Sequence, residues 1–132
     1  MTKKEYKDCQ LVAIALNKIY KLSIIVFITI PIYFLTNTKG YNFWFEILFS
    51  ISCLLLIFQS WHLYFDAQLF KKIANHEITL EDVDLILVRL FNKKMNSKSV
   101  GSRIKGCYKF VKYFQLLLIL HLILFFFKIT IP

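Results

Sequence analysis

The sequence predicts an all-α integral membrane protein with three transmembrane helices, the first two forming a hairpin, and a short amphipathic cytoplasmic helix. Hydrophobic residues make up 58% of the 132 residues, which exceeds the roughly 45–50% of soluble domains. They gather in three long apolar runs, at residues 22–35, 43–65 and 110–131. Outside these runs too few apolar residues remain to build a water-soluble core.

The first predicted span covers residues 22–36. Its apolar run would form a helix only about 21 Å long, which is shorter than the hydrocarbon core of about 30 Å. We therefore expect the helix to include the preceding turn, with Lys18 and Lys21 reaching toward the headgroups. Pro31 predicts a kink within the span. Residues 1–21 are predicted to be cytoplasmic or interfacial, because apolar residues recur there at helical spacing: Leu11, Val12, Ile14, Ala15 and Ile19.

The second span, residues 43–65, would be roughly 34 Å long as a helix, enough to cross the bilayer. The short turn Asn37–Gly40 precedes it, so the first two spans are expected to be antiparallel. Glu46 falls in the first turn of the second span, where the helix dipole favours an anion. Lys39 is close enough in sequence to pair with Glu46. The third span is predicted at residues 110–131.

The segment 66–109 is predicted to be a cytoplasmic loop that contains one helix, residues 80–91. Thr79 and Asp82 are spaced as in a capping box, in which each side chain bonds the other residue's backbone amide. At 12 residues this helix is too short to cross a bilayer. Its apolar residues fall on one stripe: Val83, Ile86, Leu87, Leu90 and Phe91.

The distribution of positive charge predicts the orientation. The chain has a net charge of +9 and 17 Lys and Arg residues, and all of these except Lys39 and Lys128 lie in residues 1–21 or 66–112. The positive-inside rule therefore places the N-terminus and the loop in the cytoplasm, and the C-terminus on the periplasmic or extracellular side. Because topology accounts for the charge, nucleic acid binding is not expected. The absence of an Asn-x-Ser/Thr sequence favours a bacterial inner membrane.

Residues 93–112 form a basic block without any acidic residue. Positive-inside topology explains this block. Anionic lipid headgroups offer a second explanation, since each Lys or Arg near the membrane surface contributes about 1 kcal/mol of binding. The candidate lipid contacts are Lys93, Lys94, Lys98, Arg103, Lys105, Lys109 and Lys112.

A polar corner is predicted at the cytoplasmic end of the second span. Gln59, His62 and Asp66 are spaced i, i+3 and i+7, so they share one face of a helix. His62 and Asp66 could form a hydrogen bond. Gln115 enters on the third span at a similar depth, which predicts a contact between His62 and Gln115. This corner is either a proton-handling or ligand-binding site, or a set of interfacial side chains with only structural roles.

His121 is predicted to lie near the bilayer midplane. A charged histidine is costly there, so we expect a neutral ring that forms an interhelical hydrogen bond, with a proton path as the alternative. Its depth differs from that of His62, which argues against a shared metal site. Cys9, Cys53 and Cys107 form no metal-binding spacing and are expected to be free thiols. No metal and no cofactor is therefore predicted.

No catalytic motif is recognisable in the sequence, and an enzyme is not expected. The leading hypothesis is a small accessory, regulatory or immunity-type protein that binds another membrane protein or associates with itself. One alternative is a small oligomeric transporter, channel or proton-handling protein that uses the polar corner and His121. Another is a protein that binds or modifies anionic lipids.

Overall fold

The computed structural model describes residues 1–36, 42–91 and 99–130, and within these ranges it contains helices and no strands. Three helical segments are long and apolar enough to span a membrane: Lys3–Leu35, Phe43–Ala74 and Val100–Thr130. The chain is thus an all-α membrane protein with three spans and one shorter helix, as predicted. The predicted turn Asn37–Gly40, with Lys39, lies outside the described residues.

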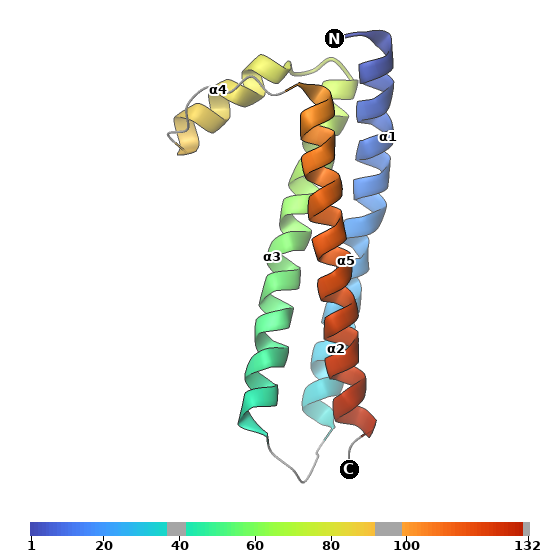
Figure 1. The fold of residues 1–132 in the computed structure, drawn as a ribbon, viewed down its shortest axis with the longest axis vertical. Helices are drawn as coiled ribbons and strands as arrows, with labels where there is room; N and C mark the ends of the chain where they lie inside the picture. Colours follow the sequence, from blue (N-terminus) through green and yellow to red (C-terminus); the bar gives the residue numbers. More distant parts are fainter. Residues whose placement is uncertain (37–41, 92–98, 131–132) are drawn as a thin grey trace.

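The three spans form an elongated bundle (Figure 1). Helices α1 (Lys3–Tyr20) and α2 (Ile24–Leu35) run one after the other along it, α3 (Phe43–Ala74) returns, and α5 (Val100–Thr130) runs parallel to the first pair. The N-terminus and the C-terminus lie at opposite ends, which we call the N-terminal end and the C-terminal end of the bundle. The first and second spans are therefore antiparallel, as the hairpin prediction requires.

Helix α1 begins at a capping box, formed by Thr2 and Glu5, that was not predicted from the sequence. Thr2 Oγ1 accepts from the Glu5 amide at 3.3 Å, and a Glu5 carboxylate oxygen accepts from the Thr2 amide at 2.6 Å. These bonds satisfy two amides that a helix start otherwise leaves unpaired. The helix therefore starts almost at the first residue, well before the predicted span.

The buried face of α1 differs from the predicted stripe. Leu11 and Ile14 are 57% and 50% exposed, although both belong to that stripe. The buried residues are instead Cys9, Val12, Ala13 and Leu16, spaced i, i+3, i+4 and i+7. In place of a turn into the membrane, α1 connects to α2 through a single 3-10 turn, Lys21–Ser23. Pro31 lies within α2, which is helical on both sides of it.

Two exposed tryptophans on α3 mark the extent of the apolar span. Trp44 and Trp61 are 72% and 74% exposed, and about 26 Å of helix separates them. This spacing approaches the thickness of a hydrocarbon core, and tryptophan favours the two bilayer interfaces. The part of α3 that follows Trp61 and Tyr64 therefore extends into and beyond the headgroup layer.

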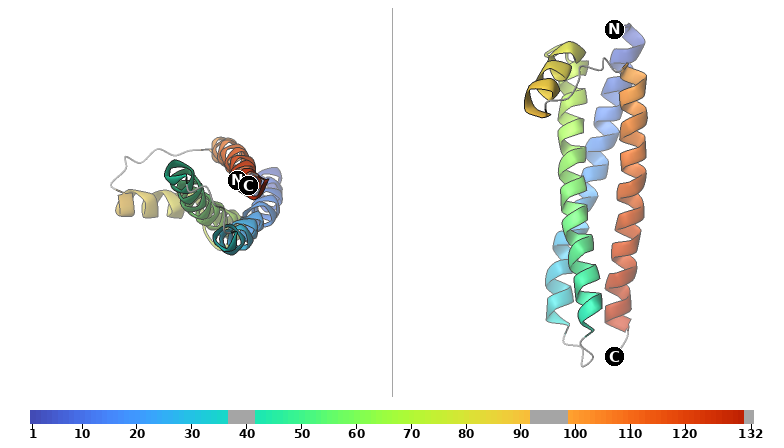
Figure 2. Two further views of the ribbon diagram at one scale, coloured as in Figure 1. Left: turned by 90° about the horizontal axis from the view of Figure 1, so that it is seen from below. Right: turned by 60° about the vertical axis from the view of Figure 1, so that its left-hand side comes forward.

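Helix α3 ends at Ala74, and two residues later His76 has a φ of 60°, in the left-handed region. Histidine is one of the few residues other than glycine that adopt this conformation with some frequency. The Tyr6 ring of α1 packs on the His76 ring with 3.9 Å between centroids. The chain then changes direction, and α4 (Leu80–Phe91) projects sideways from the N-terminal end of the bundle (Figures 1 and 2).

The predicted capping box of α4 is confirmed. Thr79 Oγ1 accepts from the Asp82 amide at 3.2 Å, and Asp82 Oδ2 accepts from the Thr79 amide at 2.8 Å. The predicted apolar stripe is mostly not buried. Val83 is buried, but Ile86 and Leu90 are 53% and 71% exposed. Nothing is described for the Phe91 side chain.

The cap predicts how α4 responds to acid. Hydrogen bonds from the Thr79 backbone and side chain hold the pKa of Asp82 below its usual value. Because the pKa is lowered in the folded state, the stabilisation is complete above the unfolded pKa and is lost as the pH falls through the folded pKa. In an NMR titration, the Thr79 amide shift should follow Asp82 with a midpoint below that of an unstructured aspartate. Thr79→Ala should raise this midpoint, whereas an ordinary midpoint in the unmodified protein would contradict the cap.

Candidate functional site

The structure places Gln59, His62 and Asp66 on one helix, α3, but does not join them to one another. His62 is exposed, and its ring lies near the rings of Phe58 and Phe110, at 4.8 and 5.5 Å between centroids. The Cys107 thiol of α5 donates to Asp66 Oδ2 at 3.5 Å. The suggested hydrogen bond between His62 and Asp66 is therefore replaced by separate contacts from these two residues to α5.

No hydrogen bond joins His62 and Gln115, both of which are described, and their predicted contact stays a prediction. Both side chains are exposed, and the aromatic ring of Phe110 occupies the position next to His62. Residues at equal depth meet only if both helices turn the corresponding faces toward each other, which depth alone does not determine. Among the described residues, Gln59 Oε1 is buried and has no hydrogen-bond partner.

His121 forms the polar centre of the bundle, and its side chain is completely buried. Its Nε2 lies 2.8 Å from Thr29 Oγ1 of α2, and its Nδ1 lies 2.8 Å from Ser52 Oγ of α3. The Cys53 sulfur lies 3.9 Å from the same Nδ1. The predicted interhelical hydrogen bond of His121 is thus confirmed, and it joins all three spans.

The hydrogen bonds of this centre can be assigned by counting donors. Thr29 Oγ1 is also 3.0 Å from the Val26 carbonyl, and Ser52 Oγ is 2.7 Å from the Phe49 carbonyl. A neutral imidazole has one donor and one acceptor nitrogen. One hydroxyl therefore donates to the ring, while the other accepts from the ring and donates to its own helix's carbonyl. Neither ring nitrogen is left without a partner.

Thr29 and Ser52 were not predicted as partners of His121. Thr29 lies about 1.7 turns from the helix end at the C-terminal end of the bundle, and Ser52 and His121 each lie about 2.5 turns from it. Matching the depths of polar residues across antiparallel helices could have identified them. Serine and threonine are common within spans, because they can bond their own backbone, so the signal is weak without knowing which faces meet.

A column of rings continues from His121 toward the C-terminal end. Phe49 stacks on His121 at 4.8 Å and on Tyr33 at 3.6 Å between centroids. Lys128 Nζ lies 3.5 Å from the centre of the Tyr33 ring and donates to Glu46 Oε1 at 2.8 Å. The partner of Glu46 among the described residues is thus Lys128 of α5. This column links the three spans from their polar centre to their ends.

The basic side chains of residues 93–112 do not form one continuous exposed surface among the described residues. Arg103 forms an ion pair with Asp84 of α4, and both side chains are 12% exposed, so Arg103 is not available to a lipid in the way predicted. Lys105, Lys109 and Lys112 are exposed on α5. Their spacing places them on one face of that helix. The remaining candidate lipid contacts, Lys93, Lys94 and Lys98, lie outside the described residues.

The two histidines of the predicted functional residues, His62 and His121, lie apart: His121 is in the interior of the bundle and His62 is on its surface. Among the described residues, no three His, Cys, Asp or Glu side chains lie close enough to hold a metal ion. The three cysteines are buried free thiols. Neither a known protein family, nor a curated protein, nor a solved structure matches this chain.

Proposed function

We propose that this chain is a small accessory, regulatory or immunity-type protein of a bacterial inner membrane, which acts by binding another membrane protein. The observation that carries the proposal is the position of α4. This helix leaves the bundle with Ile86 and Leu90 exposed on its apolar stripe. An amphipathic helix that packs only part of its apolar stripe on its own protein keeps apolar side chains for a second surface.

The base of α4 is held, so the exposed stripe has a defined position. Val83 and Asp84 are 4% and 9% exposed, and Asp84 pairs with Arg103 of α5. A helix held in this way loses less conformational freedom on binding than a free segment does. The geometry therefore favours presentation of Ile86 and Leu90 to a partner.

The charges of α4 favour a protein partner over an anionic lipid surface. Glu81 and Asp82 are exposed in its first turn, where a negatively charged leaflet would repel them. A partner with an apolar groove and a neighbouring Lys or Arg would match both the stripe and the carboxylates. The positive-inside distribution supports placing this contact on the cytoplasmic side.

Photocrosslinking in membranes of the native host tests the proposal. A benzophenone amino acid at Leu90 should form a covalent adduct with another membrane protein, identified by mass spectrometry. The same amino acid at Glu81, which is exposed on the same helix away from the stripe, is the matched control and should form little of that adduct. Adducts at Leu90 with lipid alone, or with a second copy of the chain alone, would contradict the proposal.

A further inference from the structure

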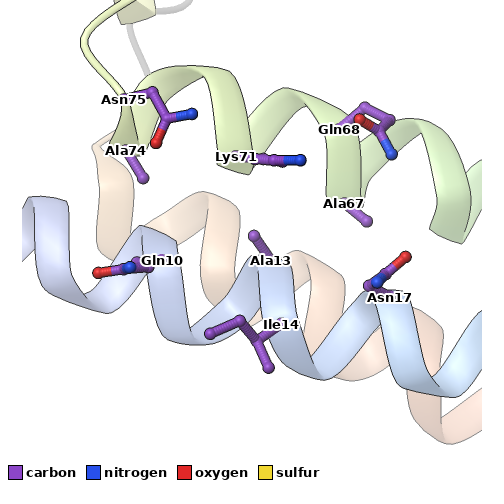
Figure 3. Close-up of a pocket in the computed structure, with 9 residues that line it drawn as sticks. All are labelled: Gln10, Ala13, Ile14, Asn17, Ala67, Gln68, Lys71, Ala74 and Asn75. Atoms are coloured by element: carbon purple, nitrogen blue, oxygen red, sulfur yellow. The ribbon is translucent and has the colours of Figure 1, made fainter.

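A polar groove lies between α1 and α3 at the N-terminal end of the bundle, away from α4's exposed stripe and from His121. Its volume is about 370 Å³, which is within the range of small-ligand sites. Figure 3 shows side chains from both helices around it. The lining residues are Gln10, Ala13, Ile14, Asn17, Ala67, Gln68, Lys71, Ala74 and Asn75.

The groove exists because small residues line it where the two helices face each other. Ala13 and Ala67 are 7% and 2% exposed, and their methyl groups leave space that larger side chains would fill. Longer polar residues surround these alanines. Gln10 and Asn17 follow one face of α1 at i and i+7, and Gln68 and Lys71 follow one face of α3 at i and i+3.

The polar groups of the groove are unused within the described part of the chain. No hydrogen bond or ion pair is formed there by the side chains of Gln10, Asn17, Gln68 or Lys71. Asn75 Nδ2 donates to Glu77 Oε1 at 3.4 Å. None of the nine lining residues is acidic, and Lys71 is the one charged residue among them. The groove thus offers one cation and several amide donors without a neutralising carboxylate in its lining.

The groove begins at the depth of the headgroups. The rings of Tyr20 and Tyr64 meet at 5.1 Å between centroids, one turn closer to the bilayer than Asn17 and Gln68. Gln68 and Lys71 lie about 6 and 10 Å further along α3 than Tyr64, and a headgroup layer is about 5–8 Å thick. Figure 3 shows the Lys71 side chain extending along the groove toward Gln68, and so toward the bilayer.

We infer that this groove binds a phosphate group, supplied by the headgroup of an anionic phospholipid. The Lys71 ammonium would neutralise the phosphate charge, as lysine does in many phosphate sites. The amide N–H groups of Asn17 and Gln68 would donate to phosphate oxygens, and the amide oxygens could accept from hydroxyls of a headgroup such as glycerol. This site differs from the predicted lipid contacts on α5, and it does not depend on the proposed partner of α4.

Native mass spectrometry of the full chain released from nanodiscs of mixed phosphatidylcholine and phosphatidylglycerol tests the site. Lys71→Gln should weaken phosphatidylglycerol retention about tenfold or more, because it removes a charged hydrogen bond. Lys72→Gln is the matched control, since it removes the same charge from the next residue, which does not line the groove. It should change retention by no more than about fivefold, the effect of surface charge alone.

A second variant separates the groove from the surface potential. Asn17→Leu leaves the charge unchanged but removes a donor and fills space, and it should weaken phosphatidylglycerol retention about fivefold. Equal effects of Lys71→Gln and Lys72→Gln, or no effect of Asn17→Leu, would overturn the site.

Competition with inorganic phosphate distinguishes a phospholipid ligand from a soluble phosphate ligand. Displacement of the lipid at millimolar phosphate assigns a soluble phosphate ligand, whereas retention of the lipid assigns the phospholipid.

Discussion

Replacing His121 with alanine is expected to destabilise the bundle by about 2–4 kcal/mol. The His121 side chain is completely buried and contacts α2 and α3 through both ring nitrogens. Its removal leaves a cavity beneath the stacked Phe49 ring and breaks two interhelical hydrogen bonds. Unfolding by sodium dodecyl sulfate in mixed micelles, followed by circular dichroism, measures the change.

The cavity should account for most of this loss. Thr29 and Ser52 keep backbone carbonyls as partners, at 3.0 and 2.7 Å, so neither hydroxyl becomes unsatisfied when the ring is removed. Interhelical hydrogen bonds within membranes average only about 0.6 kcal/mol. His121→Leu, which retains most of the side-chain volume, should therefore cost clearly less than His121→Ala. Equal losses in the two variants would show that the hydrogen bonds dominate instead.

Matched variants of the two hydroxyl residues complete this test. Thr29→Val and Ser52→Ala each remove the hydroxyl partner of one nitrogen of His121, so each should destabilise by about 1 kcal/mol. In a His121→Leu background, the same substitutions should have almost no effect, because the coupled partner is already absent. Additive losses in the double variants would contradict a shared hydrogen-bonded centre.

The sequence sufficed to predict three spans and one short helix, because length and apolar content determine them. The predicted bounds of the second and third spans were too short: α3 continues to Ala74 and α5 begins at Val100, so both ends of the predicted loop 66–109 are helical. Polar residues there do not stop a helix that extends beyond the apolar layer. The 12 residues of α4, Leu80–Phe91, match the predicted bounds, since a capping box marks its start. The burial of His121 also followed from sequence, because a polar ring at the midplane must find a partner inside the bundle. These predictions depend on position along a helix, which the sequence gives directly.

Rotation of each helix about its own axis was not predictable. Spans α3 and α5 carry Phe, Leu and Ile on all sides, so their apolar pattern does not indicate which face is buried. The contacts of His62 with Phe110 and of Lys128 with Glu46 depend on this rotation. In α1, Leu11 is exposed whereas the less apolar Ala13 is buried, so hydrophobicity alone did not identify the buried face.

Arg103→Ala is expected to release α4 from the bundle. The substitution leaves the Asp84 carboxylate, a side chain only 12% exposed in the ion pair, without its charged partner. Removing one member of a buried ion pair costs about 3–5 kcal/mol when the other member stays buried. Helix α4 can avoid most of this cost by moving Asp84 into water, because among its described side chains Val83 is the only other fully buried one, with Leu80 and Leu87 half-buried. Local detachment should therefore replace global unfolding.

Two measurements separate these outcomes. Spin labels on unnatural amino acids at Leu85 of α4 and Lys109 of α5, both exposed, leave the buried cysteines untouched. Electron paramagnetic resonance should give a narrow distribution of distances between the two labels in the unmodified protein and a broad one in Arg103→Ala. The free energy of unfolding of the spans in detergent should change by less than about 1 kcal/mol. A narrow distribution in Arg103→Ala would mean that α4 is held by other contacts.

The exchanged pair, Arg103→Asp with Asp84→Arg, provides the rescue. It restores opposite charges at the same two positions, so the narrow distribution should return if charge pairing holds α4.

The same variants connect the fold to the proposed function. If Ile86 and Leu90 bind a partner, Arg103→Ala should weaken the crosslink formed from Leu90, because a free helix loses more conformational freedom on binding. The exchanged pair should recover this crosslink together with the narrow distance. Recovery of the distance without the crosslink would instead mean that Arg103 or Asp84 contacts the partner directly.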